Sequence, residues 1–245
     1  MNSLNGKKWN KLVDLIRNPI RRGQFDRFVK YLEDHTAYFT APASPSYHCS
    51  WEEGLLEHSI NVAQNAVILN RALKANLNEE ELVICGLFHD LGKAVIAEDT
   101  PYYMFNEPTD NQKKYGFVAQ KQFKYNEAGQ VFMSVPQRAV RIVTQFIDIS
   151  DTAYQAILIH DGMYPGCYNE MYACKECPMA LILHMADSWS GFVLEGSMKV
   201  ISSGKGYEKV PPTDKVGYRG DEVRVSMTQA NEVNELVPCD PFNKY

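Results

Sequence analysis

The sequence GLFHDLGK occupies residues 86–93 and places a histidine and an aspartate side by side at the end of an apolar segment. Imidazole and carboxylate groups are costly to bury unless they are paired or bound to a metal ion. Neighbouring residues on a helix point about 100° apart, so His89 and Asp90 can both reach one ion near the end of a helix. Gly92 lets the chain turn close to that ion. This stretch therefore predicts a metal centre on a helical scaffold.

Two other segments with helical character carry a metal-binding type of side chain. His58 lies in a long amphipathic pattern over residues 51–74. Asp187 lies in a strongly apolar segment over residues 179–194. Taken singly, each is more often a hydrogen-bonded core residue than a ligand. Taken with His89 and Asp90, the two imidazoles and two carboxylates suit Mn²⁺, Fe²⁺, Co²⁺, Ni²⁺ or Zn²⁺ and leave positions for water and a phosphate oxygen.

Three short motifs, in their order and spacing, are similar to those of a known family. GLLEHS at 54–59, GLFHDLGK at 86–93 and HMAD at 184–187 resemble the H…HD…D signature of the HD-domain phosphohydrolases. The lead-in APASPSYH at 41–48 is similar to the approach segment of the HD-domain 3′–5′ exoribonuclease group and of related phage and bacterial hydrolases. The resemblance runs from about residue 39 to 191, and it implies an all-α core of five or more helices.

The resemblance also implies roles for individual residues. It makes His58, His89, Asp90 and Asp187 the ligands of one divalent metal ion, with Mn²⁺ favoured and Fe²⁺, Co²⁺, Ni²⁺, Zn²⁺ and Mg²⁺ left open. It makes Lys93 a phosphate-contacting residue, because the His-Asp-x-Gly-Lys form places a cation about one turn beyond the ligands. The alternative for Lys93 is a solvated lysine at the end of a helix.

Four further residues are candidates for roles around the metal. His160 and Asp161 end a helix before a glycine, and His160 could contact phosphate or protonate a leaving group. Its alternative is a histidine that interacts with the dipole at a helix C-terminus. Asp161 or Glu57 could orient the attacking water. His48, the last residue of the lead-in, is a candidate substrate-binding residue.

The number of metal ions follows from a departure from the family pattern. Dinuclear members use additional histidines between the His-Asp pair and the final aspartate, whereas residues 94–159 contain none. A second ion would have His160 and little else. One ion per chain is therefore predicted.

The domain organisation is expected to be simple. Residues 1–195 form the all-α HD-domain core, with a small β-hairpin inserted at about 98–134. Residues 196–245, which lie beyond the resemblance, form an extended appendage of uncertain order. Alternating residues such as Phe117, Phe123 and Tyr125, around the Glu-Ala-Gly sequence at 127–129, predict the hairpin. Helices are expected at 7–16, 24–34, 51–74, 78–92, 137–146, 151–160 and 179–194.

The insert also carries basic residues interleaved with aromatic ones. Such a mixture could stack a base and hold phosphates, or it could be a solvated hairpin with one packed face. The four candidate substrate-binding lysines are Lys113, Lys114, Lys121 and Lys124.

Three of the cysteines could form part of a structural zinc site. Cys174 and Cys177, with Cys167 upstream, supply three of the four ligands that a structural zinc site needs. A single CxxC without a second pair is a weak signal, and ordinary reduced loop cysteines are favoured.

Composition excludes some classes of partner. The formal net charge of -5 gives no general attraction to nucleic acid, so a polyanionic substrate needs a local basic patch or a metal. No apolar run approaches the roughly 18 residues of a membrane span. We expect a cytoplasmic protein with no membrane partner, with a phage-encoded enzyme acting in the host cytoplasm left open. A homo-oligomer also remains open.

The sequence therefore predicts a metal-dependent phosphohydrolase that acts on a nucleotide or a nucleotide-derived phosphate ester through metal-activated water. One alternative is a 3′–5′ exonuclease or phosphodiesterase acting on an RNA or DNA end or on a cyclic nucleotide. Another is a non-catalytic sensor that binds a nucleotide. A degenerate sensor would be expected to have lost at least one ligand, and all four are present.

Overall fold

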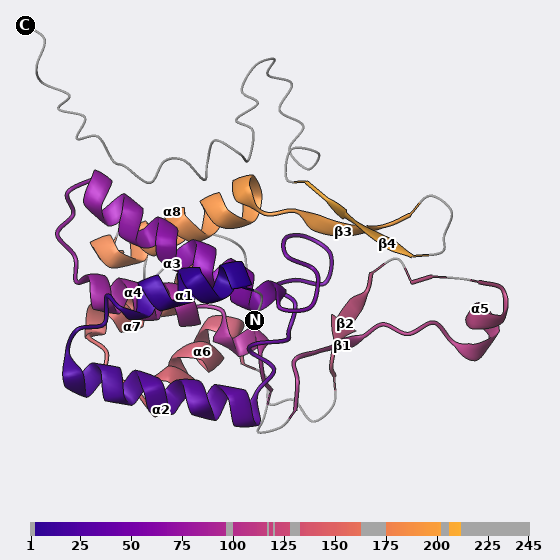
Figure 1. Ribbon diagram of the computed structural model, residues 1–245, viewed down its shortest axis with the longest axis horizontal. Coiled ribbons are helices and arrows are strands. Elements are labelled where there is room, and N and C mark those ends of the chain that lie inside the picture. The colour runs from indigo at the N-terminus through magenta and orange to yellow at the C-terminus, as the bar shows by residue number, and fades with distance from the viewer. Residues whose placement is uncertain are drawn as a thin grey trace, which may run out of the picture.

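The computed structural model describes residues 3–96, 100–116, 118–119, 121–127, 133–162, 175–201 and 206–211. These residues form a helical core with two small β-hairpins that project from the same side (Figure 1). The predicted all-α core with a small hairpin is confirmed. The helices of the core are α1 (Ser3–Val13), α2 (Pro19–His35), α3 (Gly54–Ala72), α4 (Glu79–Phe88), α6 (Val135–Val143), α7 (Asp151–Leu158) and α8 (Pro178–Trp189), with short turns η1 (Leu91–Lys93) and η3 (Ser190–Leu194).

Helix α3 lies at the centre of the core and packs against α4 and α8. The α3–α4 contact depends on a glycine, because a Cβ at Gly86 would come within 2.4 Å of the Ala63 Cα. Helix α4 begins where the sequence predicts, since the Asn78 side chain accepts hydrogen bonds from the backbone N–H groups of Glu80 and Glu81. The close α3–α4 packing brings the helices that carry the candidate ligands side by side.

Helices α1 and α2 cover one side of this core through aromatic contacts. The Phe28 ring lies 4.9 Å from Phe88 and 5.0 Å from Phe146, and Trp9 lies 5.9 Å from Phe25. Helix α2 begins at Pro19, not at the predicted residue 24. The Asn18 side chain caps it and the proline occupies the first turn, where its missing N–H has no cost.

The insert forms the predicted hairpin, but with a longer connection than expected. Strands β1 (Tyr103–Phe105) and β2 (Phe123–Tyr125) are antiparallel, with Tyr103 opposite Tyr125. A short helix, α5 (Asp110–Lys114), lies between them at the tip. The connection between the two strands is therefore residues 106–122, and the sequence around 127–129, where the turn was expected, follows β2. Residues 128–129 and Phe117 lie outside the described residues.

Part of the predicted C-terminal appendage also forms a hairpin. Strands β3 (Ser197–Val200) and β4 (Tyr207–Val210) are antiparallel and follow directly after η3. A backbone hydrogen bond holds the start of this hairpin against the loop before α3, where the Cys49 N–H donates to the Gly196 carbonyl oxygen at 2.8 Å. Residues 212–245 lie outside the described part of the chain.

Within the described residues, no helix is long and apolar enough to cross a membrane.

Cys177 lies at the N-terminus of α8 as its capping residue, and its N–H donates to the Gln155 side chain. The other two cysteines of the considered zinc site, Cys167 and Cys174, lie outside the described residues.

Candidate metal centre

Two imidazoles meet at the centre of the core. His58 lies in the first half of α3, and His89 caps the C-terminus of α4, where its N–H donates to the Cys85 carbonyl oxygen. Their Nε2 atoms are 3.2 Å apart, and both side chains are fully buried. The predicted helix over 78–92 ends earlier, at Phe88, and the chain continues as the short turn η1. A Cβ at Gly92 would lie within 2.2 Å of the Val135 carbonyl oxygen. Gly92 therefore allows close packing against α6.

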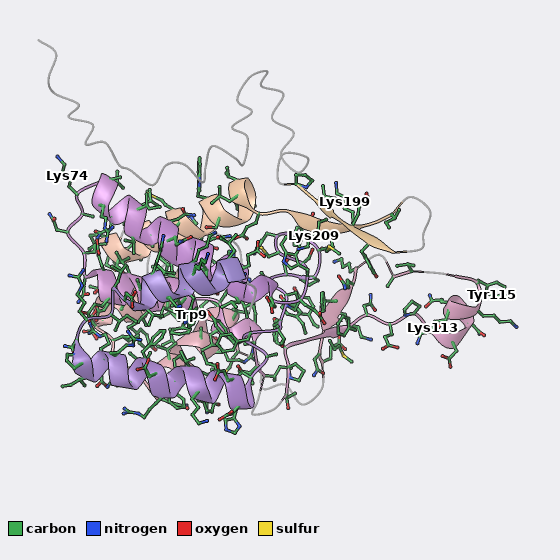
Figure 2. The ribbon with its side chains drawn as sticks, in the orientation of Figure 1. Trp9, Lys74, Lys113, Tyr115, Lys199 and Lys209 are labelled. Atoms are coloured by element: carbon green, nitrogen blue, oxygen red, sulfur yellow. The ribbon has the colours of Figure 1, made fainter. Side chains whose placement is uncertain are left out.

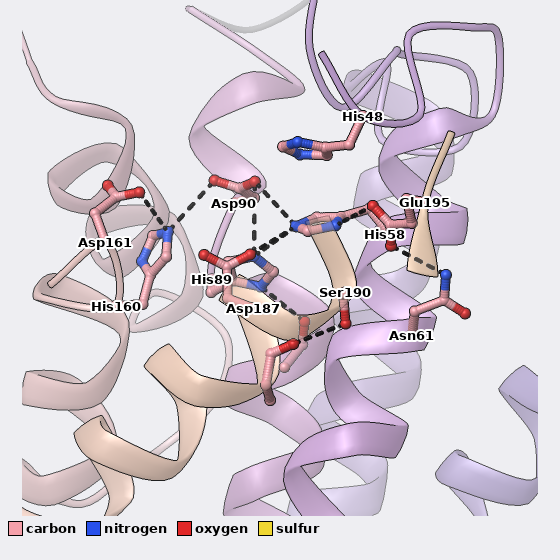
Figure 3. Close-up of polar contacts among 12 residues, drawn as sticks. His48, His58, Asn61, His89, Asp90, His160, Asp161, Asp187, Ser190 and Glu195 are labelled. Atoms are coloured by element: carbon pink, nitrogen blue, oxygen red, sulfur yellow. Dashed lines mark hydrogen bonds and ion pairs between the residues drawn. The ribbon is translucent and has the colours of Figure 1, made fainter. Parts of the chain in front are cut away.

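Two carboxylates complete the cluster (Figure 3). Asp187 of α8 places Oδ1 3.1 Å from His58 Nε2 and 3.7 Å from His89 Nε2. Asp90 places Oδ2 3.6 Å from the Nε2 atoms of both histidines. Residues from three segments far apart in sequence therefore converge on one point, as the sequence predicts.

The remaining ring nitrogens explain how the histidines are oriented. His58 Nδ1 lies 2.8 Å from a Glu195 carboxylate oxygen, and His89 Nδ1 lies 2.9 Å from the Gly86 carbonyl oxygen. Both oxygens accept hydrogen bonds, so each Nδ1 is the donor. In the neutral rings this leaves the Nε2 lone pairs facing each other and the carboxylates. Such a set of facing lone pairs fits a divalent cation.

Without a cation, the buried imidazoles and carboxylates of the cluster shift one another's pKa values. Burial alone would lower the pKa of His58, but Glu195 and Asp187 outweigh it and raise that pKa to about 10. Burial lowers the pKa of His89 to about 4. Burial alone would raise the pKa of Asp187, but the hydrogen bond to His58 and the other nearby imidazoles hold it well below its usual value. The two imidazoles thus differ in charge, and a proton on one of them partly neutralises the carboxylates.

Lys93 lies directly beside the cluster. Its Nζ donates to Asp90 Oδ2 at 2.5 Å. Burial alone would lower the pKa of Lys93, but Asp90 raises it, so the side chain remains a cation. Lys93 is therefore held as a fixed positive charge next to the centre.

His160 and Asp161 also join the cluster. His160 Nε2 lies 3.5 Å from Asp90 Oδ1 and 3.6 Å from Asp161 Oδ1, and His160 Nδ1 donates to the Ile157 carbonyl oxygen. Burial opposes protonation of His160, but Asp161 and Asp90 raise its pKa to about 9. His160 is buried behind these carboxylates, whereas Asp161 faces the pocket described next.

A pocket of about 840 Å³ opens above the cluster. It lies between the end of α8 with η3, the loop before α3, and the first strand of the C-terminal hairpin. His48 lies on its wall with its ring 4.6 Å from the His58 ring, centroid to centroid. The lining residues are Ser46, Tyr47, His48, Asp90, Lys93, Asp161, Asp187, Ser188, Gly191, Phe192, Ser197 and Lys199.

The four lysines of the insert lie outside this lining. Lys113 is at the tip of the insert, far from the helical core (Figure 2), and pairs with Glu107 at 2.9 Å. Lys114 is exposed on the same short helix. Lys121 and Lys124 line a separate pocket of about 420 Å³ on the β1–β2 hairpin. Their substrate-binding role remains a prediction.

Some residues near the centre were not predicted. Glu195 and Lys199 come from the segment beyond the resemblance, where no periodic pattern marks a site. Asn61 lies three residues after His58 and so on the same face of α3, which was the one signal available. Glu57, a candidate for orienting water, instead accepts a hydrogen bond from the Trp51 ring N–H at 3.2 Å.

A comparison with protein-family models identifies one matching family. The model of the HD domain matches residues 55–190, which include His58, His89, Asp90 and Asp187. No curated protein and no solved structure matches the chain.

Proposed function

The chain belongs to the HD-domain family of metal-dependent phosphohydrolases, and from this premise we propose that it hydrolyses a nucleotide or a nucleotide-derived phosphate ester. The observation that carries the proposal is the position of the ligand side chains at the floor of the large pocket. Asp90 and Asp187 line the pocket, with His58 and His89 buried beneath them. Its volume of about 840 Å³ falls within the roughly 300–1,000 Å³ typical of small-molecule sites.

A divalent ion at this centre would supply Lewis acidity, polarising a phosphate oxygen and lowering the pKa of a water molecule. The protein's own residues do the rest. Lys93 places a fixed positive charge where negative charge develops on the phosphate. Asp161, which faces the pocket, would orient the attacking water. His160 would hold the carboxylates of Asp90 and Asp161 in place from behind.

The walls of the pocket support the nucleotide part of the proposal. Tyr47 is 69% exposed and Phe192 is 58% exposed, although both line the same pocket. Exposed aromatic rings of this kind can stack on a nucleobase. Lys199 on β3 and Lys93 give the pocket two cations for phosphate groups. These features together suit a molecule with one aromatic part and one strongly anionic part.

A second candidate, hydrolysis at a nucleic-acid end, is favoured by one observation. The β1–β2 hairpin carries its own pocket, lined by Lys121, Lys124, Phe123 and Tyr125. Basic and aromatic side chains in one groove are typical of single-strand binding. An oligonucleotide could occupy both pockets, whereas a single nucleotide would occupy only the one above the metal ligands.

The proposal is tested by assaying the purified protein with Mn²⁺ against a panel of nucleoside mono- and triphosphates, cyclic nucleotides and short oligonucleotides. The variants Asp90→Asn and Asp90→Ala should lose both Mn²⁺ binding and hydrolysis, because Asp90 is a ligand that also holds Lys93. Asp26→Ala, which removes an exposed carboxylate from α2, is the matched control and should retain both. Wild-type protein that binds Mn²⁺ and a nucleotide without turnover would instead be a sensor.

A further inference from the structure

The contact between His58 and Glu195 joins the metal centre to a segment beyond the matched family region. One imidazole is held from two sides: Asp187 of α8 contacts His58 Nε2 at 3.1 Å, and Glu195 contacts His58 Nδ1 at 2.8 Å. The family match ends at residue 190, before Glu195.

The carboxylate of Glu195 is almost fully buried, and both of its oxygens accept hydrogen bonds. Its residue is 3% exposed, and a buried carboxylate is costly unless it is fully hydrogen-bonded. One oxygen accepts from His58, and the other accepts from Asn61 Nδ2 at 3.0 Å. Both donors stand on one face of α3, so the carboxylate is oriented as well as satisfied.

The backbone that carries Glu195 is itself fixed to α3. The Glu195 N–H donates to the Ser190 carbonyl oxygen at 3.0 Å, which closes the π-helical turn η3. The Ser190 hydroxyl donates to the Ala186 carbonyl oxygen and accepts from Asn65 Nδ2 at 2.9 Å. The π-helical turn therefore delivers Glu195 to His58 through contacts that do not involve the pocket. Figure 3 shows both arms of this network, from Asn61 and from Ser190.

We infer that Glu195 is a positioning residue for the metal centre. By accepting the Nδ1–H of His58 it fixes the tautomer that leaves Nε2 free to bind the ion, and its charge makes the ring a stronger donor to that ion. The segment from η3 to β3 is thus part of the metal centre as well as a wall of the pocket. The inference rests on the proposed metal-dependent function.

The decisive experiment measures metal binding without substrate, with Co²⁺ alone as the probe. The Kd for Co²⁺ and the visible absorption spectrum of the bound ion are measured for wild type, Glu195→Gln and Glu195→Ala. Partners of metal-bound histidines contribute about 10–100-fold in metal affinity. We expect Glu195→Ala to raise the Kd by that amount and to change the spectrum. Glu195→Gln, which keeps the side-chain volume, should raise the Kd by about 10-fold or less, but measurably.

Glu81→Gln provides the matched control, because Glu81 is also a buried carboxylate, 4% exposed, with partners in Arg21 and Ser150. It should lower Tm and leave the Co²⁺ affinity and spectrum of the wild type. The inference is overturned if both Glu195 variants bind Co²⁺ as the wild type does, and the Gln variant alone decides if the Ala variant does not fold. Wild-type protein that binds no Co²⁺ would overturn the proposed function as well.

Discussion

At the scale of single residues, the orientation of each imidazole ring in the cluster is fixed by what its Nδ1 atom contacts. His58 donates to a carboxylate, whereas His89 and His160 donate to carbonyl oxygens one helical turn earlier in the chain. Backbone acceptors orient a ring without adding charge. The surrounding carboxylates decide the basicity. Against the effect of burial, Glu195 and Asp187 raise the pKa of His58, and Asp161 and Asp90 raise that of His160. In His89 the effect of burial prevails and the pKa is lowered. The three histidines therefore differ in basicity although all three are buried.

Lys93 gives the clearest prediction at this scale. Lys93→Ala should lower kcat/KM by roughly 10²-fold or more, because a fixed charge that stabilises the transition state is lost. Metal content, measured by elemental analysis, should stay at the wild-type level, since Lys93 contacts Asp90 without being a ligand. Lys30→Ala, which removes an exposed lysine from α2, should change neither quantity. An unchanged rate in Lys93→Ala would make Lys93 an ion-pair partner of Asp90 and no more.

At the scale of elements, the two hairpins have different relations to the centre. The β3–β4 hairpin borders the pocket through Ser197 and Lys199. The β1–β2 hairpin carries Lys121 and Lys124 in a neighbouring pocket, and its tip helix α5 extends away from the core. Substitutions in the hairpin that borders the pocket should therefore raise KM for every substrate. Substitutions in the other hairpin should raise KM only for substrates long enough to reach it.

The insert lysines test which substrate is used. Replacing Lys121 and Lys124 together by Ser should raise KM for an oligonucleotide and flatten its salt dependence, because phosphate contacts are lost. The pair Lys113 and Lys114, replaced in the same way, tests the two lysines at the tip separately, and only an oligonucleotide long enough to reach the tip should show a higher KM. For a mononucleotide neither pair should matter, whereas Lys199→Ser should raise KM. The measurement is steady-state kinetics over a range of salt concentrations. If neither double substitution changes KM for any substrate, the insert has a structural role.

At the scale of the whole molecule, the metal centre joins the parts of the fold. Its candidate ligands come from α3, from the end of α4 and from α8, and Glu195 adds the segment that leads into β3. A bound ion would therefore link segments more than a hundred residues apart. Anything that binds the folded chain alone adds to its free energy of unfolding, so metal binding and stability are coupled.

This coupling also tests the number of ions. Mn²⁺ at about 100 times its Kd adds about 2.7 kcal/mol to the free energy of unfolding. In a chain of this length that corresponds to a Tm rise of roughly 5–10 °C. We expect calorimetric titration to saturate at one ion per chain, and His160→Ala to keep that ion while it lowers turnover. Two tightly held ions, one of them lost in His160→Ala, would contradict the single-ion prediction and favour a phosphodiester substrate.

The sequence alone determined the class of fold and indicated the candidate ligand set. His89, Asp90 and Gly92 lie within one short motif, and the helices on either side have periodicity and caps such as Asn78 that depend only on neighbouring residues. Helix ends were the least predictable of these local features. Helix α2 begins five residues before the predicted residue 24, because Asn18 and Pro19 form a start signal within the sequence NPIRRG at 18–23, which resembles a break between helices.

Only the tertiary structure decided how the centre is supported and what faces it. Glu195 reaches His58 across 137 residues of chain, and Lys199 reaches the pocket on a strand that no pattern indicated. Both depend on the π-helical turn η3, whose geometry is fixed by Asn65 and Ala186 on two different helices. Local sequence encodes the direction of a side chain on its own element. Which elements meet depends on packing between distant segments, and a single sequence carries no periodic signal for that.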